Sequence, residues 1–119
     1  MRDQYISADS LREFGTVIFE RLGLPGPDAA VVADCLVQAN LRGLDSHGVA
    51  RIPIYAKRLR MGLVNPRPDL QVTRVAPGAA QLDGDDGMGM AVGTRAMTEA
   101  IALAREAGIG VVGVRRSTH

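Results

Sequence analysis

The sequence predicts a mixed α/β fold, in which amino-terminal helices are followed by part of a mixed sheet. Three observations support this prediction. The first half of the 119-residue chain repeats apolar residues at helical spacing. The second half begins with two short segments. The first alternates apolar and polar side chains, as a half-exposed strand does, and the second could pair with it. Near the carboxyl end, residues 109–114 are continuously apolar apart from glycine, which is typical of a strand buried on both faces.

Two helices are predicted within the first 43 residues. Ser7 or Asp9 can cap the first helix, which must end before Pro25. Pro27 suits the first turn of the second helix, and Gly43 suits its carboxyl end. The residues expected to face the core are Leu11, Phe14, Ile18 and Leu22 in the first helix and Ala29, Val32, Leu36 and Val37 in the second.

A third helix is predicted from about Ser46 to Met61. Pro53 removes a backbone donor and clashes one turn back, so we expect a late start or a kink. The apolar side of this helix is formed by Ile52, Tyr55 and Leu59. After it the pattern changes, so we expect residues 1–62 to form an amino-terminal helical segment and residues 63–119 to begin a mixed α/β domain.

The second half predicts two strands, a helix and a further strand. Residues 70–75 alternate apolar and polar side chains, and residues 79–82 can pair with them. The Gly-rich segment 84–89 is interpreted as a turn leading into a helix over about 90–107. Its buried stripe is expected at Met97, Ile101 and Ala104. The last strand, 109–114, needs covering layers that the remaining residues do not supply, so the predicted fold is incomplete.

The composition excludes several classes of protein. With 14 basic and 13 acidic residues the net charge is +1, which gives no electrostatic reason to expect nucleic acid or a membrane as a partner. The basic residues Lys57, Arg58, Arg60 and Arg67 are interpreted as a solvated surface. The sequence shows no signal peptide or membrane span, and the single Cys35 cannot form an intramolecular disulfide. We expect a cytoplasmic protein without a metal site.

The densest group of reactive side chains lies in residues 45–51. In a helix, His47 and Arg51 would share a face. A guanidinium binds a carboxylate through two parallel hydrogen bonds, and an imidazole or the Ser46 hydroxyl can add others. This predicts a site for a small carboxylate. The alternative is a helix start capped by Asp45 or Ser46, with the histidine and the arginine solvated.

A second candidate site is Ser117–His119, which directly follows the predicted last strand. Ligands of open α/β sheets bind beyond the carboxyl ends of strands. A histidine there can give or take the proton when a carbonyl is reduced to an alcohol. The alternative is that His119 is a frayed chain end without a catalytic role.

The Gly-rich segment 84–89 is less suited to a dinucleotide. Its glycines miss the G-x-G-x-x-G spacing by one residue, because Val92 stands where the last glycine would fall. Asp83, Asp85 and Asp86 would also repel phosphates. The segment is therefore predicted to be structural.

These motifs together resemble those of the malate/L-lactate dehydrogenase family, which is unrelated to the Rossmann-type lactate dehydrogenases. That family also includes ureidoglycolate dehydrogenase, sulfolactate dehydrogenase and the cyclic-imine reductases. The resemblance covers nearly the whole chain. The residues that carry it are Asp45-Ser46-His47-Gly48-Val49 with Arg51, Asp83-Gly84 with Gly87 and Gly89, and Ser117 with His119 after the apolar strand.

The resemblance implies a homodimeric oxidoreductase that uses NAD or NADP to interconvert a 2-hydroxyacid and a 2-oxoacid. It implies that His119 is the catalytic acid/base and that Ser46, His47 and Arg51 line the substrate pocket, with Arg51 on the carboxylate. Family chains are longer, so the cofactor-binding residues are expected mostly beyond His119, and this polypeptide alone is expected to be inactive. The alternative is a self-sufficient, non-catalytic binding or oligomerisation module derived from that family.

Overall fold

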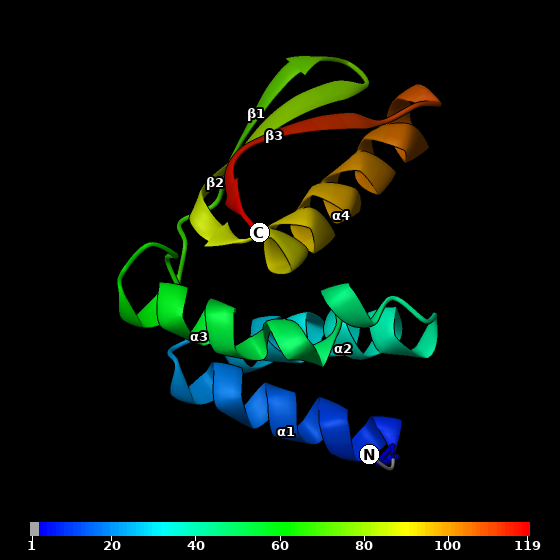
Figure 1. Cartoon of the computed structure of the whole chain (residues 1–119). Helices are drawn as coiled ribbons and strands as arrows, with labels where there is room; N and C mark the ends of the chain where they lie inside the picture. The colour runs from blue at the N-terminus through cyan, green and yellow to red at the C-terminus, as the bar shows by residue number, and fades with distance from the viewer. Residues whose placement is uncertain (1–2) are drawn as a thin grey trace. The chain divides into compact units, whose positions relative to one another are not determined.

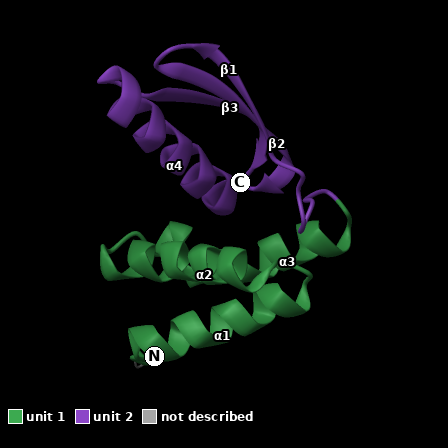
Figure 2. Ribbon diagram, turned by 180° about the vertical axis from the view of Figure 1, so that it is seen from behind, with its two compact units in different colours: residues 1–62 green, residues 63–119 purple. Residues whose placement is uncertain are grey.

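A computed structural model describes residues 3–119 of the chain. The chain divides into two compact units, Met1–Gly62 and Leu63–His119 (Figure 2). The first unit is helical, and the second combines a three-stranded sheet with one long helix (Figure 1). The predicted mixed α/β class is therefore confirmed. No helix within residues 3–119 has the length and apolar character needed to cross a membrane.

Unit 1 contains the helices α1 (Ala8–Arg21), α2 (Gly26–Leu41) and α3 (Ile52–Arg60). The Ser7 Oγ accepts a hydrogen bond from the Ser10 N–H at 3.1 Å, so Ser7 caps α1 as predicted. Gly43 lies just beyond the end of α2 and has φ +78°, the left-handed conformation that glycine adopts easily. The predicted ends of these two helices are thus confirmed.

The faces of α1 and α2 agree with the prediction only in part. A Cβ added to Gly15 of α1 would lie 3.0 Å from the Cβ of Ala33 of α2, so small residues allow the helices to pack closely. All four residues predicted to be buried in α2 are buried. In α1 the prediction for Phe14 is wrong: it is 60% exposed, whereas Phe19 is fully buried. The reason is that Gly15 and Phe19, four residues apart, define the face that meets α2.

The third helix starts at Ile52, later than the start at about Ser46 that the sequence pattern predicts. Two 3₁₀ turns, η1 (Asp45–His47) and η2 (Val49–Arg51), precede α3. Pro53 lies in the first turn of α3, where its missing N–H costs no helical hydrogen bond. An α-helical start at Ser46 is therefore wrong, and the predicted late start is confirmed. Gly48, with φ −95° and ψ −150°, interrupts the helical backbone.

Unit 2 contains β1 (Gln71–Ala76), β2 (Ala79–Met88), α4 (Gly89–Ala107) and β3 (Val111–Thr118). β2 is the middle strand, and it pairs antiparallel with β1 and parallel with β3. The helix α4 is the crossover between the two parallel strands and packs against both (Figure 1). The predicted order of strand, strand, helix and strand is confirmed.

The Gly-rich segment 84–89 is mostly strand, so its interpretation as a turn is wrong. β2 runs through it, and α4 follows directly. Pairing with β3 slips between Asp83 and Gly87, so that residues 84–86 lie opposite the single residue Arg116. A bulge of this kind lets one strand bend while pairing resumes beyond it.

The predicted burial of α4 and β3 is also wrong. The residues that α4 buries are Val92, Ala96 and Leu103. Val92 and Ala96 form a cluster with Leu82 of β2, which sets the inner face of the helix. The predicted stripe lies next to this face, and Met97 is 61% exposed. β3 was expected to be buried on both faces, but it is largely exposed because it is an edge strand of the described sheet.

Substitution of Gly110 tests the packing between α4 and the start of β3. A Cβ on Gly110 would overlap the carbonyl oxygen of Ala100 in α4. We expect Gly110→Ala to lower the free energy of unfolding by about 2 kcal/mol or more, because backbone atoms cannot rotate aside. The measurement is urea denaturation of the protein.

Gly93→Ala is the matched control for this substitution. An added Cβ on Gly93 has no neighbour within 4 Å in the described chain, apart from its own helix. Alanine favours a helix over glycine, so the free energy of unfolding should rise by about 0.5–1 kcal/mol. Equal changes from the two substitutions would contradict the packing of Gly110 against α4.

Candidate functional site

The connection between α2 and α3 holds the three predicted substrate-binding residues together. Ser46 and His47 lie in η1, and Arg51 is the last residue of η2. The Ser46 Oγ and the His47 Nδ1 are 2.8 Å apart, and the Arg51 Nε donates to the Ser46 carbonyl oxygen at 2.7 Å. The three residues form one cluster, although not through the shared α-helical face that was predicted.

The cluster can bind an anion. Arg51 is half-buried, and its Nε is engaged by the main chain, which fixes the orientation of the guanidinium. Its two terminal nitrogens are the pair that can hold a carboxylate end-on. Ser46 and His47 are exposed beside it, and their hydroxyl and imidazole can exchange donor and acceptor roles according to the histidine tautomer. A small carboxylate fits this donor set.

Asn40, in the last turn of α2, fixes the shape of this connection and is not predicted from the sequence. Its Nδ2 donates to the Asp45 Oδ1, and its Oδ1 accepts from the Val49 N–H, both at 2.8 Å. The carboxamide therefore ties together both ends of the segment that carries Ser46 and His47. A polar residue near a helix end is ordinary, so the sequence holds no signal for this role.

Gly48 lets Asn40 approach the main chain. Gly48 is buried, and a Cβ on it would overlap the Asn40 carboxamide. The alternative prediction of a helix cap at Asp45 or Ser46 is wrong, because neither α3 nor the 3₁₀ turns have a side-chain cap. Its other part agrees with the structure for His47, which is exposed, and less so for Arg51, which is half-buried. The Asp45 carboxylate is instead the acceptor for Asn40.

His119, the predicted acid/base, lies in unit 2 and directly follows the last residue of β3. It is exposed, and Thr118 before it is half-buried. The Thr118 Oγ1 donates to the Gly87 carbonyl oxygen of β2 at 2.8 Å. The carboxyl end of a parallel strand is a usual place for a residue that meets a ligand. His119 and the cluster at residues 45–51 belong to different units.

Charged side chains surround the bulge of β2. The Asp83 Oδ1 accepts from the Arg116 Nε at 2.8 Å, and the Asp83 Oδ2 lies 3.2 Å from an Arg115 terminal nitrogen. The Asp83 side chain is only 17% exposed. The hydrogen bond from Arg116, followed by that from the Asp85 N–H, lowers the pKa of the Asp83 carboxyl below its ordinary value of 3.8. Folding therefore favours the charged form of Asp83.

Asp83 is expected to make stability depend on pH in acid. Because its pKa is lower in the folded chain, its contribution is present above about pH 4 and is lost as the pH falls through the folded pKa. The free energy of unfolding, measured by urea denaturation, should decrease over that range. Asp83→Asn should flatten the decrease, and Glu99→Gln, which breaks an ion pair with Arg95 on α4, should retain it. An unchanged slope in Asp83→Asn would contradict the assignment.

The bulge does not offer a cradle for cofactor phosphates. A Cβ on Gly84 would lie 2.8 Å from the Arg116 carbonyl oxygen, and one on Gly87 would lie 2.7 Å from the Pro68 Cγ. The space beside both glycines is thus filled by protein, and the Asp83 carboxylate stands at the same place. Nicotinamide dinucleotide phosphates do not fit here. Across residues 3–119, no three His, Cys, Asp or Glu side chains gather as metal ligands would.

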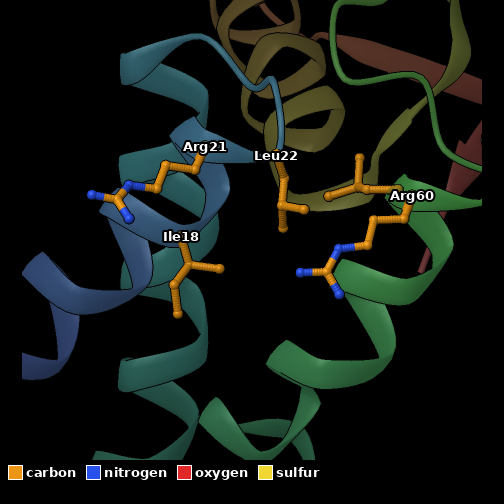
Figure 3. Close-up of a pocket in the computed structure, with 5 residues that line it drawn as sticks. Ile18, Arg21, Leu22 and Arg60 are labelled. Atoms are coloured by element: carbon orange, nitrogen blue, oxygen red, sulfur yellow. The ribbon is translucent and has the colours of Figure 1, made fainter.

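The described part of unit 1 has a hollow of about 640 Å³, which includes Asn40, Asp45 and Val49 in its lining and so adjoins the segment that Asn40 fixes. A smaller hollow of unit 1, of about 410 Å³, is lined by Ile18, Arg21, Leu22, Leu59 and Arg60 (Figure 3). Its two arginines lie in the last turns of α1 and α3, where positive charge is favourable beside the helix dipole. None of the predicted site residues lines either hollow.

Comparison with known proteins shows close relatives. Residues 6–119 match the malate/L-lactate dehydrogenase family. The chain is 45% identical over 114 residues to malate dehydrogenase from Pyrococcus abyssi, covering 96% of this chain and 32% of the relative. It is 41% identical over 102 residues to L-sulfolactate dehydrogenase from Methanocaldococcus jannaschii, covering 86% of this chain and 30% of the relative.

A solved structure shows the same similarity. Malate dehydrogenase from Pyrococcus horikoshii superposes on the chain with a TM-score of 0.90 at 41% identity. The superposition covers 99% of this chain and 36% of the solved chain. The 119 residues therefore span about a third of the length of the relatives they match.

Proposed function

The chain belongs to the malate/L-lactate dehydrogenase family, and on this premise we propose that it is the amino-terminal part of an NAD(P)-dependent oxidoreductase acting on 2-hydroxyacids. The reaction interconverts a 2-hydroxyacid and a 2-oxoacid. The relatives described above are dehydrogenases named for malate and for L-sulfolactate. The observation that carries the proposal is the cluster of Ser46, His47 and Arg51, because it presents a fixed guanidinium and two polar groups to an anion.

In the proposed reaction, Arg51 binds the substrate carboxylate through its terminal nitrogens. Ser46 and His47 add hydrogen bonds that orient the substrate, which lowers the entropic part of the barrier. His119 gives a proton to the 2-oxo oxygen on reduction and removes it from the 2-hydroxyl on oxidation. A nicotinamide cofactor, NAD or NADP, supplies the hydride chemistry when bound.

We propose that most of the residues that hold this cofactor lie outside the 119 residues. The relatives are about three times as long, and protein fills the space beside the glycines of the β2 bulge. Residues 1–62 then form an amino-terminal helical segment, and residues 63–119 begin a mixed α/β domain. By the same resemblance, the protein is proposed to be a cytoplasmic homodimer.

Two polypeptides test the proposed function. Residues 1–119 alone should not oxidise malate, lactate or sulfolactate with NAD or NADP, because they lack most of the cofactor site. The protein made from the complete reading frame should oxidise at least one of them, or reduce a cyclic imino acid, as followed by the nicotinamide absorbance.

Each polypeptide can contradict a different part of this proposal. Turnover by residues 1–119 alone would contradict the placement of the cofactor site. Absence of turnover of every such substrate by the complete protein would contradict the dehydrogenase function. Self-association and cooperative unfolding of residues 1–119 would, in that case, favour a non-catalytic module.

A further inference from the structure

We propose that Asp83 is a positioning residue for His119, acting through Arg116 and the end of β3. The proposal rests on the proposed function, which makes His119 the acid/base. It assigns a role to a charged group that the proposed function leaves unused. We call Asp83, Asp85 and Arg116 the bulge clamp.

The bulge clamp ties β2 to the end of β3. The Arg116 Nε donates to the Asp83 Oδ1 at 2.8 Å, and its Nη2 lies 3.4 Å from the Asp85 Oδ1. The Asp85 N–H donates to the Asp83 Oδ1 at 3.0 Å. The Asp85 Oδ2 in turn accepts from the Asn65 Nδ2 and the Asp69 N–H, both at 3.0 Å. One guanidinium is thus held by two carboxylates, and one of these is anchored to the segment before β1.

The backbone of the bulge clamp adopts a conformation that side-chain-bearing residues avoid. Its members Asp85 and Arg116 have φ values of 48° and 53°, and Asp86, which follows Asp85 in the bulge, has a φ of 58°. This left-handed region costs free energy for any residue with a Cβ, and more for arginine than for aspartate. Such conformations persist only where the surroundings over-determine them, and they cluster at functional sites.

The end of β3 is also packed closely against β2 and against the first residue of α4. A Cβ on Gly84 would lie 2.8 Å from the Arg116 carbonyl oxygen, and one on Gly89 would overlap the Thr118 carbonyl oxygen. The Thr118 Oγ1 donates to a β2 carbonyl oxygen at 2.8 Å. Because His119 follows Thr118 directly, its main chain starts from a position that the bulge clamp determines.

The arrangement is better suited to positioning than to stability. Ion pairs near a surface contribute little to folding, and the Arg116 side chain is 52% exposed. The pair of Arg95 with Glu99, by contrast, lies on the regular backbone of α4 and at a distance in sequence from β3. A misplacement of about 1 Å at a reacting group can lower a rate by about 100-fold. A clamp with a small effect on stability can therefore have a large effect on turnover.

A double-mutant cycle in the protein made from the complete reading frame tests the proposal. Asp83→Asn removes the charge and keeps the volume. It should lower kcat by about 10–100-fold and change KM by less than about 3-fold, because the substrate is bound by other residues. In a His119→Ala background the same substitution should change kcat by less than about 2-fold, because the group that it positions is gone. Glu99→Gln should leave kcat within about 2-fold in both backgrounds.

Two outcomes of the cycle would overturn the proposal. One is an equal loss of kcat from Asp83→Asn in the two backgrounds, which would show that Asp83 acts independently of His119. The other is no loss in either background. Arg116→Lys is the second variant: it keeps the charge without the planar fork and should show the same pattern if Asp83→Asn does not fold.

NMR order parameters separate this proposal from the proposed function. In Asp83→Asn, the backbone order parameters of Thr118 and His119 should fall from about 0.85 to below about 0.6, while those of Val112 and Val114 stay unchanged. If His119→Ala leaves turnover unchanged, the proposed function fails at His119. If His119→Ala abolishes turnover but Asp83→Asn leaves the order of Thr118 and His119 unchanged, the positioning proposal alone fails.

Discussion

His119→Ala, in the protein made from the complete reading frame, is expected to lower kcat by about 10²–10⁴-fold. Without the imidazole, the proton on the substrate oxygen must be exchanged with water instead of with a positioned group. KM should change little, because Arg51 and its neighbours bind the carboxylate. Steady-state kinetics with the 2-hydroxyacid and the nicotinamide cofactor measure both values.

His47→Ala is the matched control, since the chain has two histidines. His47 lies beside Ser46 in the substrate cluster, so its removal should raise KM more than it lowers kcat. Full activity in His119→Ala would remove His119 from the mechanism. An equal loss of kcat in His119→Ala and His47→Ala would contradict the assignment of the acid/base role to His119.

Arg51→Ala is expected to lower kcat/KM for a 2-hydroxyacid by about 10²–10³-fold. The substitution removes the charge-assisted hydrogen bonds to the carboxylate and leaves that carboxylate without its partner. It also removes the hydrogen bond from the Arg51 Nε to the Ser46 carbonyl oxygen, which holds the 3₁₀ turns together. Arg51→Lys should recover only part of the loss, because an ammonium cannot bind a carboxylate through a planar fork.

Arg60→Ala is the control for the arginine prediction. Arg60 lies in the last turn of α3, on the smaller hollow of unit 1 and outside the substrate cluster (Figure 3). Its removal should leave kcat/KM within about 2-fold. A substrate analogue with an amide in place of the carboxylate should be discriminated against by the wild-type protein but much less by Arg51→Ala. Equal effects of Arg51→Ala and Arg60→Ala would contradict a specific carboxylate site.

The ends of the helices were predictable from the sequence because local chemistry decides them. Ser7 caps α1 through a bond to a residue three positions away, and Gly43 and Gly108 end α2 and α4 with positive φ. The buried faces were less predictable, because they depend on the partner element. Phe14 and Met97 have the right spacing for a core, but Gly15 and Leu82 set the faces that pack.

The site residues also divide into those that local sequence indicates and those that only tertiary contacts reveal. Ser46, His47 and Arg51 were identified because their chemistry is distinctive and they are close in sequence. Asn40 and Asp83 were not identified as site residues, because their roles depend on contacts that only the folded chain shows. The hydrogen bond from Arg116 to Asp83 spans 33 positions. No local pattern indicates that an aspartate next to a glycine will meet an arginine on another strand.

The bulge in β2 limits changes in the length of the chain. β2 takes four steps from Asp83 to Gly87, whereas β3 takes two steps from Arg115 to Ser117, so the excess is two residues. Asp85 and Asp86 take up this excess with positive φ, and pairing with β3 resumes at Gly87. An insertion or deletion here would change the excess and shift the register of Gly87 and Met88 against β3. Substitutions can accumulate in this segment one at a time, but a change of its length needs a compensating change elsewhere if the pairing beyond the bulge is to be kept.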